Sequence, residues 1–261
     1  MPKAYKITII GSGNVAWHLA SALEEAGHSI QEVYSRNLVH AKKLASKLYD
    51  AFPTDDLDFG DSESKLFFIA VPDDAIEEVL EDLRIPDHAV IAHTSGTKSL
   101  NVFDLLFSSK AVFYPLQTFS KERKIIFKEI PICIEADSEE TKKVINEVAK
   151  SISHYVYYFN SEKRKVLHIA AVFACNFTNH LLALSKEILD KEEIDYGMLN
   201  PLISETINKA LDYDPQSMQT GPAIRKDVKI LQEHMKYLQD DPDKKQIYRI
   251  LSESILKMGK E

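Results

Sequence analysis

The sequence predicts an α/β protein in which an N-terminal, doubly wound and mostly parallel Rossmann sheet is followed by an all-helical C-terminal domain. Three observations predict this class. A short β-branched run near the N-terminus ends in two glycines one residue apart, strand and helix signals then alternate, and only helical periodicity remains after Asn160. The expected domains are therefore residues 1–160 and 161–261.

The first strand, Lys6–Ile10, runs directly into a glycine turn and a helix expected over residues 14–26. The first glycine permits the tight turn, and the second has no Cβ, so the backbone can approach a pyrophosphate. The N–H groups of the first helical turn then face the anion, with the helix dipole behind them. This context favours a dinucleotide site over a plain turn, with cofactor-binding residues Gly11, Ser12, Gly13, Asn14 and Val15.

The later elements follow from the same signals. Strands are expected over 29–35, 65–71, 89–93, 111–114, 131–135 and 155–159, and the apolar run at 65–71 is typical of a strand buried on both faces. Helices are expected over 38–49 with Asn37 as cap, over 75–83 with Asp73 as cap, and over 139–152. In the C-terminal part, helices are expected over 162–189, 195–211, 223–238 and 244–258.

Composition excludes several classes of partner. The net charge of −8, without a long basic run, argues against nucleic acid. Cys133 and Cys175 show neither a redox motif nor zinc spacing, so buried free thiols, a cytoplasmic location and no metal site are expected. A strand at the N-terminus argues against a signal peptide. Uninterrupted apolar runs fall well short of the roughly 18 residues of a membrane span.

The end of the second strand distinguishes NAD from NADP. An NAD site places an acid there to bind the ribose 2′-OH. This chain has Ser35, Arg36 and Asn37 instead, and Glu32 stands at the wrong end of the strand. A hydroxyl and a guanidinium suit a 2′-phosphate, so the sequence favours NADP over a merely solvent-facing arginine, with Ser35 and Arg36 as ligands.

The loops after the central strands should line the same crevice, because ligands of open α/β sheets bind at the carboxyl ends of the strands. Val71 and Pro72 follow one strand, and Thr94 and Ser95 follow the next. The two hydroxyls can contact the nicotinamide ribose or carboxamide, or they can simply form a turn. Asp73 is better explained as a helix cap than as a catalytic group.

Polar residues mark one stripe of the long helix when 100° per residue is assumed. They are Lys165, His168, Asn176 and Asn179, in a largely apolar segment. They can bond neighbouring helices or a second copy of the chain. Alternatively they face the cleft, where His168 would handle a proton and Asn176 would hold a substrate oxygen. Arg225, after Gly221-Pro222, is either an ion-pair residue or an anion ligand at a helix start.

Five segments together resemble a known family. They read G-S-G-N-V-A (11–16), H-T-S-G (93–96), Y-P-L-Q-T-F (114–119), L-H-I-A-A-V-F-A-C-N-F (167–177) and T-G-P-A-I-R-K-D (220–227). In this order the sequence resembles bacterial Rossmann-like NADP oxidoreductases with a helical C-terminal domain of unknown function. These are relatives of pyrroline-5-carboxylate reductase, ketopantoate reductase and the 6-phosphogluconate dehydrogenase superfamily.

The resemblance implies an NADP-binding domain, a C-terminal domain that often dimerises, and a cleft between them. It points to Gln117, Thr118 and Arg225 as substrate residues, and to Lys165 and Asn176 as counterparts of catalytic residues in the superfamily. The family usually has His where this chain has Tyr114, so proton transfer at that position is in question, although a phenol still donates a hydrogen bond.

Two functions are therefore expected. The first is an NADP-dependent oxidoreductase acting on a small carbonyl, hydroxyl or imine metabolite, with catalytic residues His168, Asn176 and Lys165. The second is a non-catalytic NADP-binding sensor that associates through its helical domain. A homodimer through the C-terminal helices is expected, because about 100 helical residues bury the long apolar helix poorly on their own.

Overall fold

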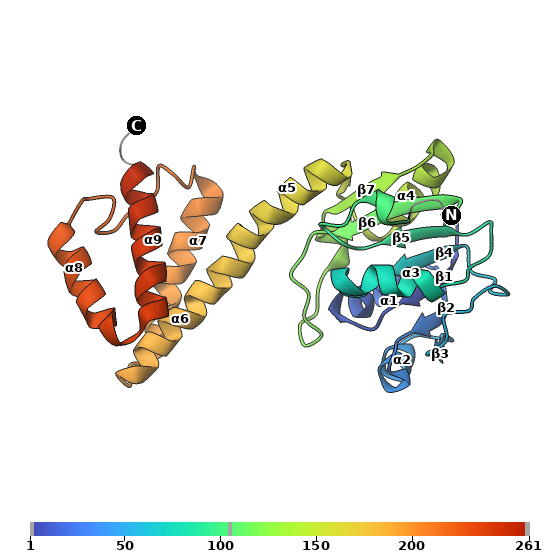
Figure 1. Cartoon of the computed structure of the whole chain (residues 1–261), viewed down its shortest axis with the longest axis horizontal. Helices are drawn as coiled ribbons and strands as arrows, with labels where there is room; N and C mark the ends of the chain where they lie inside the picture. Colours follow the sequence, from blue (N-terminus) through green and yellow to red (C-terminus); the bar gives the residue numbers. More distant parts are fainter. Residues whose placement is uncertain (1–2, 104–105, 259–261) are drawn as a thin grey trace. The chain divides into compact units, whose positions relative to one another are not determined.

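The computed structural model describes residues 3–103 and 106–258 of the chain, which form two compact units, Met1–Cys175 and Asn176–Glu261. The first unit holds the sheet and the second is helical (Figure 1). The sheet ends at Tyr158 and helices begin at Ser161, where the sequence pattern changes. The first compact unit nevertheless extends beyond Asn160, because the first helix after the sheet packs against it.

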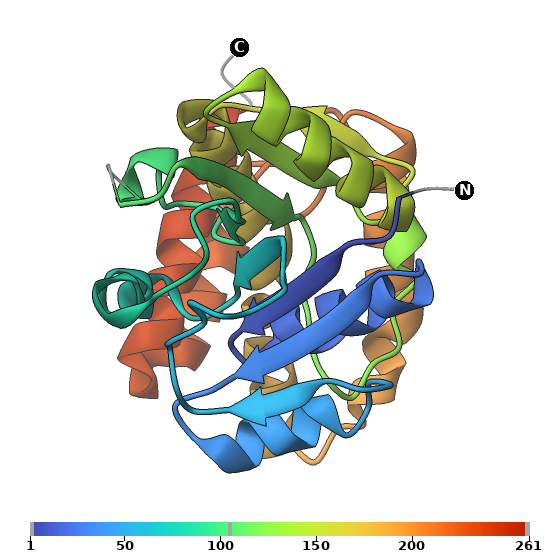
Figure 2. The same ribbon diagram turned by 90° about the vertical axis from the view of Figure 1, so that its right-hand side faces the viewer.

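The first unit contains a sheet of eight strands in the order β3-β2-β1-β4-β5-β6-β7-β8. All neighbouring strands are parallel except β6 and β7, so the expected mostly parallel, doubly wound sheet is confirmed. Figure 2 shows its twist. The strands are β1 Lys6–Ile10, β2 Ser29–Tyr34, β3 Phe52–Thr54, β4 Leu66–Ile69, β5 Val90–His93, β6 Ser109–Pro115, β7 Ile132–Ala136 and β8 Val156–Tyr158.

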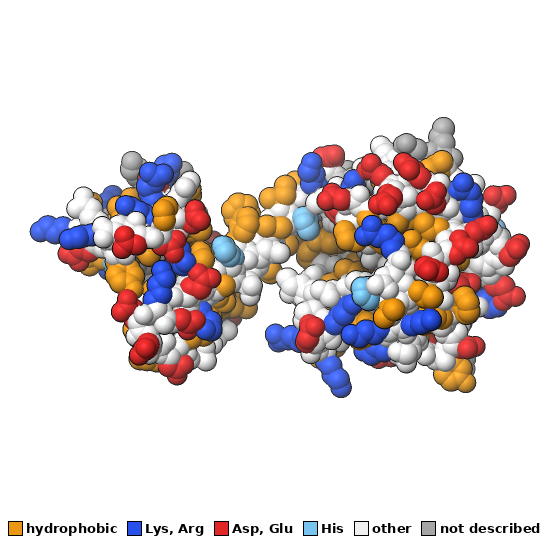
Figure 3. Space-filling model, turned by 60° about the horizontal axis from the view of Figure 1, so that its bottom comes forward, with side chains coloured by type: hydrophobic (Ala, Val, Ile, Leu, Met, Phe, Trp, Pro, Cys, Tyr) orange, Lys and Arg blue, Asp and Glu red, His pale blue; other side chains and the backbone are white. Residues whose placement is uncertain are grey.

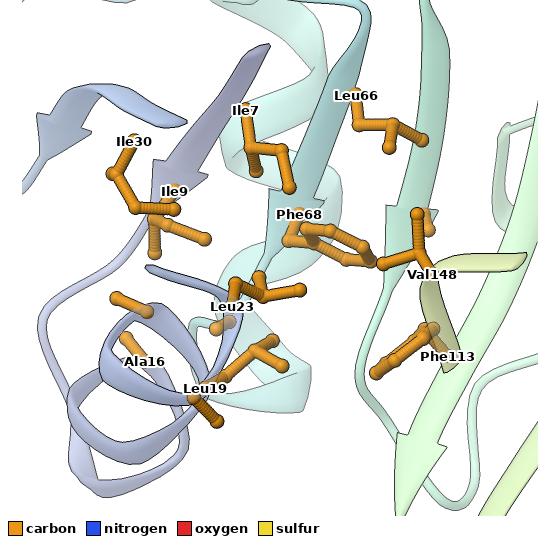
Figure 4. Packing of buried hydrophobic residues seen from close by; sticks show 14 of the residues in the cluster. Ile7, Ile9, Ala16, Leu19, Leu23, Ile30, Leu66, Phe68, Phe113 and Val148 are labelled. Carbon is orange, nitrogen blue, oxygen red and sulfur yellow. The ribbon is translucent and has the colours of Figure 1, made fainter. Parts of the chain in front are cut away.

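Two layers of helices cover the two faces of this sheet. Alternate strand residues point to opposite faces, so Ile7 and Ile9 pack under one layer while Ile10 packs under the other. Figure 4 shows Leu19 and Leu23 of the first helix lying over the strand residues. The first layer contains α1 Asn14–Glu25, α2 Leu38–Ala45 and α4 Glu139–Ile152; the second contains α3 Ile76–Asp82, preceded by the 3-10 turn η1 Asp73–Ala75.

The long apolar helix is one helical segment with an irregular centre. It consists of α5 Ser161–Ala171, a π-helical stretch Val172–Phe177 called η4, and α6 Thr178–Lys191. Asn160 caps its start by accepting a hydrogen bond from the backbone N–H of Lys163. The 100° spacing assumed from the sequence does not hold through the π-helical stretch, because π turns contain more residues than α turns.

The second unit continues with α7 Asn200–Asp212, α8 Val228–Tyr237 and α9 Pro242–Met258. The helix expected from Ala223 begins only at Val228, because Ala223–Asp227 forms a turn in which Lys226 has a φ of +60°. The helix expected to reach Tyr49 ends at Ala45, and strand β3 follows where no strand was predicted.

Candidate functional site

The glycine turn lies at the carboxyl end of β1, as the sequence predicts. Gly11 has a φ of +122°, and a Cβ there would come within 2.3 Å of the carbonyl oxygen of Ala70. A Cβ at Gly13 would lie 4.0 Å from the same carbonyl oxygen and, its chain neighbours aside, no atom of the described residues is nearer, so the space in front of α1 is open. A side chain is thus excluded at Gly11, and the first helical turn stays accessible to an anion.

A cavity of about 340 Å³ opens beside this turn and contains no acidic side chain among its lining residues. Arg36 lines it with an exposed guanidinium, whose nearest acid is Glu78 at 3.8 Å. The hydroxyl of Ser12 donates to that of Ser35 at 3.0 Å. The lining residues are Gly11, Ser12, Gly13, Tyr34, Ser35, Arg36, Asn37, His40, Ala70, Val71, Pro72, Ala75 and Val79.

These residues fit an NADP ribose 2′-phosphate. Hydroxyl groups and an arginine surround an acid-free space of the size that small-molecule ligands occupy. Glu32 accepts hydrogen bonds from Thr8, Ser62 and Ser64. It is therefore engaged elsewhere, as its strand position indicates. His40 is a lining residue that the sequence reasoning missed, although its place three residues after the helix cap Asn37 was a usable signal.

The residues after β4 and β5 meet at the carboxyl edge of the sheet, as predicted. Val71 and Pro72 line the cavity beside the glycine turn. The hydroxyl of Thr94 donates to the backbone oxygen of Ile69 at 3.2 Å. The hydroxyl of Ser95 donates to Asp73 at 2.8 Å and accepts from two backbone N–H groups, those of Thr97 and Lys98. Both hydroxyl hydrogens are thus used to build the edge. The hydroxyl oxygen of Ser95 already accepts two hydrogen bonds, whereas that of Thr94 can still accept one from a ligand.

The helix-cap interpretation of Asp73 is wrong. The residue that precedes the turn η1 is Pro72, and no side chain caps it. The Asp73 carboxylate instead accepts hydrogen bonds from the hydroxyls of Ser95 and Thr97. Asp73 therefore ties the loop after β4 to the loop after β5, a long-range link that no local pattern reveals.

Tyr114 and His168 form a pair at the end of β6. The phenol oxygen lies 3.0 Å from Nδ1 of the imidazole, and the rings meet edge to face. Both pack against Gly96, where a Cβ would come within 2.6 Å of the imidazole Nδ1 and 2.9 Å of the phenol carbon Cζ. Burial raises the pKa of Tyr114 to about 12. The motif glycine at 96 is therefore required by close packing rather than by turn geometry.

Arg164 anchors α5 to the sheet, and sequence reasoning missed it. Its side chain is fully buried, pairs with Glu135 at 2.6 Å, and donates to the backbone oxygen of Lys98. Its neighbour Lys165, the predicted catalytic residue, is exposed. The usable signal was periodicity, since positions 164 and 168 are one helical turn apart and face the sheet together.

The other predicted site residues take no part in the Tyr114–His168 pair or in the cavity beside the glycine turn. Gln117 and Thr118 are exposed, bond to each other, and line a separate cavity of about 470 Å³ together with Arg123. Asn176 lies in the π-helical stretch and is exposed. Arg225 belongs to the second unit, where it pairs with Asp227 at 3.2 Å, the ion-pair alternative of the sequence analysis.

Two family models match this chain. Residues 6–96 match the family described as NADP oxidoreductase, coenzyme F420-dependent, and residues 130–255 match a domain of unknown function, DUF2520. A crystal structure from Bacteroides fragilis, designated an NADP oxidoreductase, is 40% identical, covers 97% of this chain and 98% of its own, and has a TM-score of 0.89. No curated protein matches.

More distant structures share the fold alone. A protein from Thermotoga maritima is 22% identical with a TM-score of 0.79, covering 98% of this chain and 100% of its own. A reductive aminase from Aspergillus terreus in complex with NADPH and ethyl-5-oxohexanoate is 14% identical with a TM-score of 0.70, covering 98% of this chain and 95% of its own.

Proposed function

Because the chain belongs to the family of NADP oxidoreductases that continue into the DUF2520 domain, we propose that it transfers a hydride between NADP(H) and a small carbonyl, hydroxyl or imine metabolite. The cofactor is NADP, which supplies or accepts the hydride when bound. The observation that supports turnover is the Tyr114–His168 pair, which lies at the carboxyl edge of the sheet that carries the glycine turn.

The reaction needs a proton as well as a hydride. Reduction of a carbonyl or imine leaves an oxygen or nitrogen that must be protonated, and oxidation of a hydroxyl or amine must remove that proton. Imidazole is the side chain whose ordinary pKa suits both directions near neutral pH. His168 is therefore the group we assign to proton transfer.

Tyr114 orients this imidazole. With a pKa raised to about 12, the phenol keeps its own hydrogen at neutral pH. We assign to His168 the tautomer with its hydrogen on Nδ1, in which the phenol oxygen accepts a hydrogen bond across the 3.0 Å contact. With Nδ1–H held in this way, Nε2 takes the proton during oxidation, which leaves an imidazolium, and the imidazolium gives the proton from Nε2 during reduction. The phenol hydrogen is then available to hold the substrate oxygen or nitrogen.

The test is NADPH oxidation with a panel of small aldehydes, ketones, 2-oxo acids and cyclic imines. On any accepted compound, His168→Ala should lower turnover about 10²- to 10⁴-fold while NADPH affinity measured by calorimetry changes little. Tyr114→Phe should cost about tenfold, the loss of an orienting hydrogen bond. Lys163→Met is the matched control on the same helix.

Two outcomes would contradict the proposal. If NADPH binds but no panel compound is turned over, the non-catalytic sensor becomes the better interpretation. If His168→Ala lowers the melting temperature by several degrees, and activity falls only in proportion to folded protein, the pair is structural.

A further inference from the structure

The loop that follows β6 docks on the start of α1. Three successive residues hold it there. The backbone oxygen of Phe119 accepts from the side-chain amide of Asn14 at 2.9 Å, and the backbone oxygen of Ser120 lies 2.9 Å from Nε2 of His18. The ammonium of Lys121 donates to the backbone oxygen of Ser12 at 2.8 Å. Residues more than 100 positions apart in sequence are thereby joined at the glycine turn.

Lys121 brings an uncompensated positive charge to this turn. Its partner is a neutral carbonyl oxygen, and among the described residues no carboxylate lies within ion-pair distance of it. The ammonium also lies 5.2 Å from the centre of the Trp17 ring, which restrains it without neutralising it. The side chain is half-buried, so solvent compensates its charge only in part.

We propose that Lys121 binds the pyrophosphate of NADP, as a cation delivered from the loop after β6 to the glycine turn. The inference rests on the proposed function, because it takes NADP as the ligand of that turn. The N–H groups at the start of α1 attract an anion through the helix dipole. An ammonium is a compact charge that can turn from a carbonyl oxygen to a phosphate oxygen. The glycine turn between β1 and α1 would therefore receive a pyrophosphate ligand from a loop far away in the sequence.

Two ligands separate this contact from the rest of the site. NADP⁺ carries both the 2′-phosphate and the pyrophosphate, whereas adenosine 2′-phosphate lacks the pyrophosphate. Calorimetry should show that Lys121→Met weakens NADP⁺ binding about 10- to 30-fold and leaves adenosine 2′-phosphate within about twofold. Lys121→Arg should retain most of the NADP⁺ affinity. Added salt should narrow the difference between wild type and Lys121→Met.

Matched variants exclude a purely structural effect. Lys124→Met removes an exposed charge from the same loop and should change neither affinity. His18→Ala loosens the loop while keeping the ammonium, so it should weaken NADP⁺ less than Lys121→Met does. The melting temperature of each unliganded variant shows whether it is folded, and Lys121→Gln repeats the measurement if the Met variant is not.

Trp17 provides a second readout, because it is the single tryptophan of the chain. Its ring lies 4.0 Å from the ammonium of Lys47 and 5.2 Å from that of Lys121. NADP⁺ should change its fluorescence in wild type, as Lys121 turns toward the pyrophosphate, and much less in Lys121→Met. Adenosine 2′-phosphate should leave the emission nearly unchanged in both.

These measurements separate an error about Lys121 from an error about NADP binding as a whole. If Lys121→Met binds NADP⁺ as wild type does, or loses both ligands equally, Lys121 is not a pyrophosphate ligand. Arg36→Ala should weaken both ligands. If neither ligand binds wild type, NADP binding itself is refuted.

Discussion

At the scale of single residues, Arg36 is the arginine that lines the cavity beside the glycine turn. The cavity has no acid among its lining residues, and the guanidinium has only one distant carboxylate, Glu78 at 3.8 Å. Such a weak surface pair is easily exchanged for a phosphate. We therefore expect the Arg36 guanidinium to bind the 2′-phosphate that distinguishes NADP from NAD.

We expect Arg36→Ala to weaken NADP binding about 10- to 100-fold, since a charge-assisted hydrogen bond contributes about 1.5–3 kcal/mol. NAD binding should change little. Calorimetry with both cofactors measures this, and Lys43→Ala on the exposed side of α2 is the control. Equal affinities of the unmutated protein for NADP and NAD would refute the assignment.

His93 makes folding sensitive to acid. Its side chain is fully buried, and its pKa is lowered to about 4, first by burial and then by the nearby Arg164. Between pH 6.5 and about 4 the unfolded chain therefore binds a proton at His93 that the folded protein does not. The free energy of unfolding should fall as pH is lowered through this window, by up to about 3 kcal/mol.

Urea unfolding at about pH 7.5 and about pH 4.5 measures this loss. His93→Asn removes the titrating group but keeps an oxygen that can accept from the N–H of Ser95, so it should lose less stability in acid than wild type. His88→Asn, at an exposed position, should keep the wild-type difference. An unchanged pH dependence in His93→Asn would show that other groups cause it.

At the scale of elements, α5 is held to the sheet by one buried ion pair. Arg164 is fully buried, and the side chain of its partner Glu135 is 19% exposed. Glu135 also accepts from the hydroxyl of Ser161 at 2.8 Å, which fixes the first turn of the helix. His168, one turn later, depends on this anchor for its approach to Tyr114.

Arg164→Met should therefore destabilise the first unit by about 2–4 kcal/mol, because it leaves a partly buried carboxylate without its partner. Urea unfolding monitored by circular dichroism measures the change. The double variant Arg164→Met with Glu135→Met should recover part of the loss, and Lys163→Met should have little effect. A loss below about 0.5 kcal/mol would show that the pair contributes nothing measurable.

At the scale of the whole molecule, the described part of the second unit buries few apolar side chains. Its buried apolar side chains among the described residues are only Ala223, Leu231 and Leu238. Large apolar side chains such as Leu202, Leu211 and Ile250 are exposed, and Figure 3 shows hydrophobic side chains on the surface. Exposed apolar surface of this extent is typical of a face that binds another molecule.

One segment of the described residues, Ser161–Lys191, is long and apolar enough to cross a membrane on length and composition, with a mean hydropathy of 1.4. None of its most apolar window is buried in the described chain. That window includes Asn176, Asn179 and His180, which are costly in a bilayer core. A second copy of the chain would cover such a face without this cost.

We therefore expect a homodimer through the C-terminal helices. Sedimentation at micromolar concentration should give twice the 29.7 kDa chain mass. Leu202→Glu together with Leu211→Glu places charges on the exposed apolar face and should weaken the dimer, whereas Val39→Glu in the first unit should not. A monomer across the concentration range would refute the expectation, as would insertion into lipid vesicles.

The elements that sequence predicts well are those that depend on near neighbours. The helix Glu139–Ile152 has the expected bounds, because Ser138 and an amphipathic repeat specify it locally. The glycine turn also occurs as predicted, since Gly11 must have positive φ and no side chain. The short edge strand β3 escaped prediction, because three residues hold too little pattern and form a strand only beside β2.

The pairs that build the candidate site could not be read from the chain in this way. Tyr114 meets His168 across 54 positions, and Arg164 meets Glu135 across 29. The sequence identified His168 and Tyr114 as candidates, but it favoured exposed Lys165 over buried Arg164. Periodicity predicts which residues share a helix face only when every turn is regular, and the π-helical stretch Val172–Phe177 is not. It also does not show which face meets a neighbour, and here the packing of α5 on the sheet decides that. Local chemistry thus indicated the cofactor, while long-range packing brought together the side chains of the candidate site.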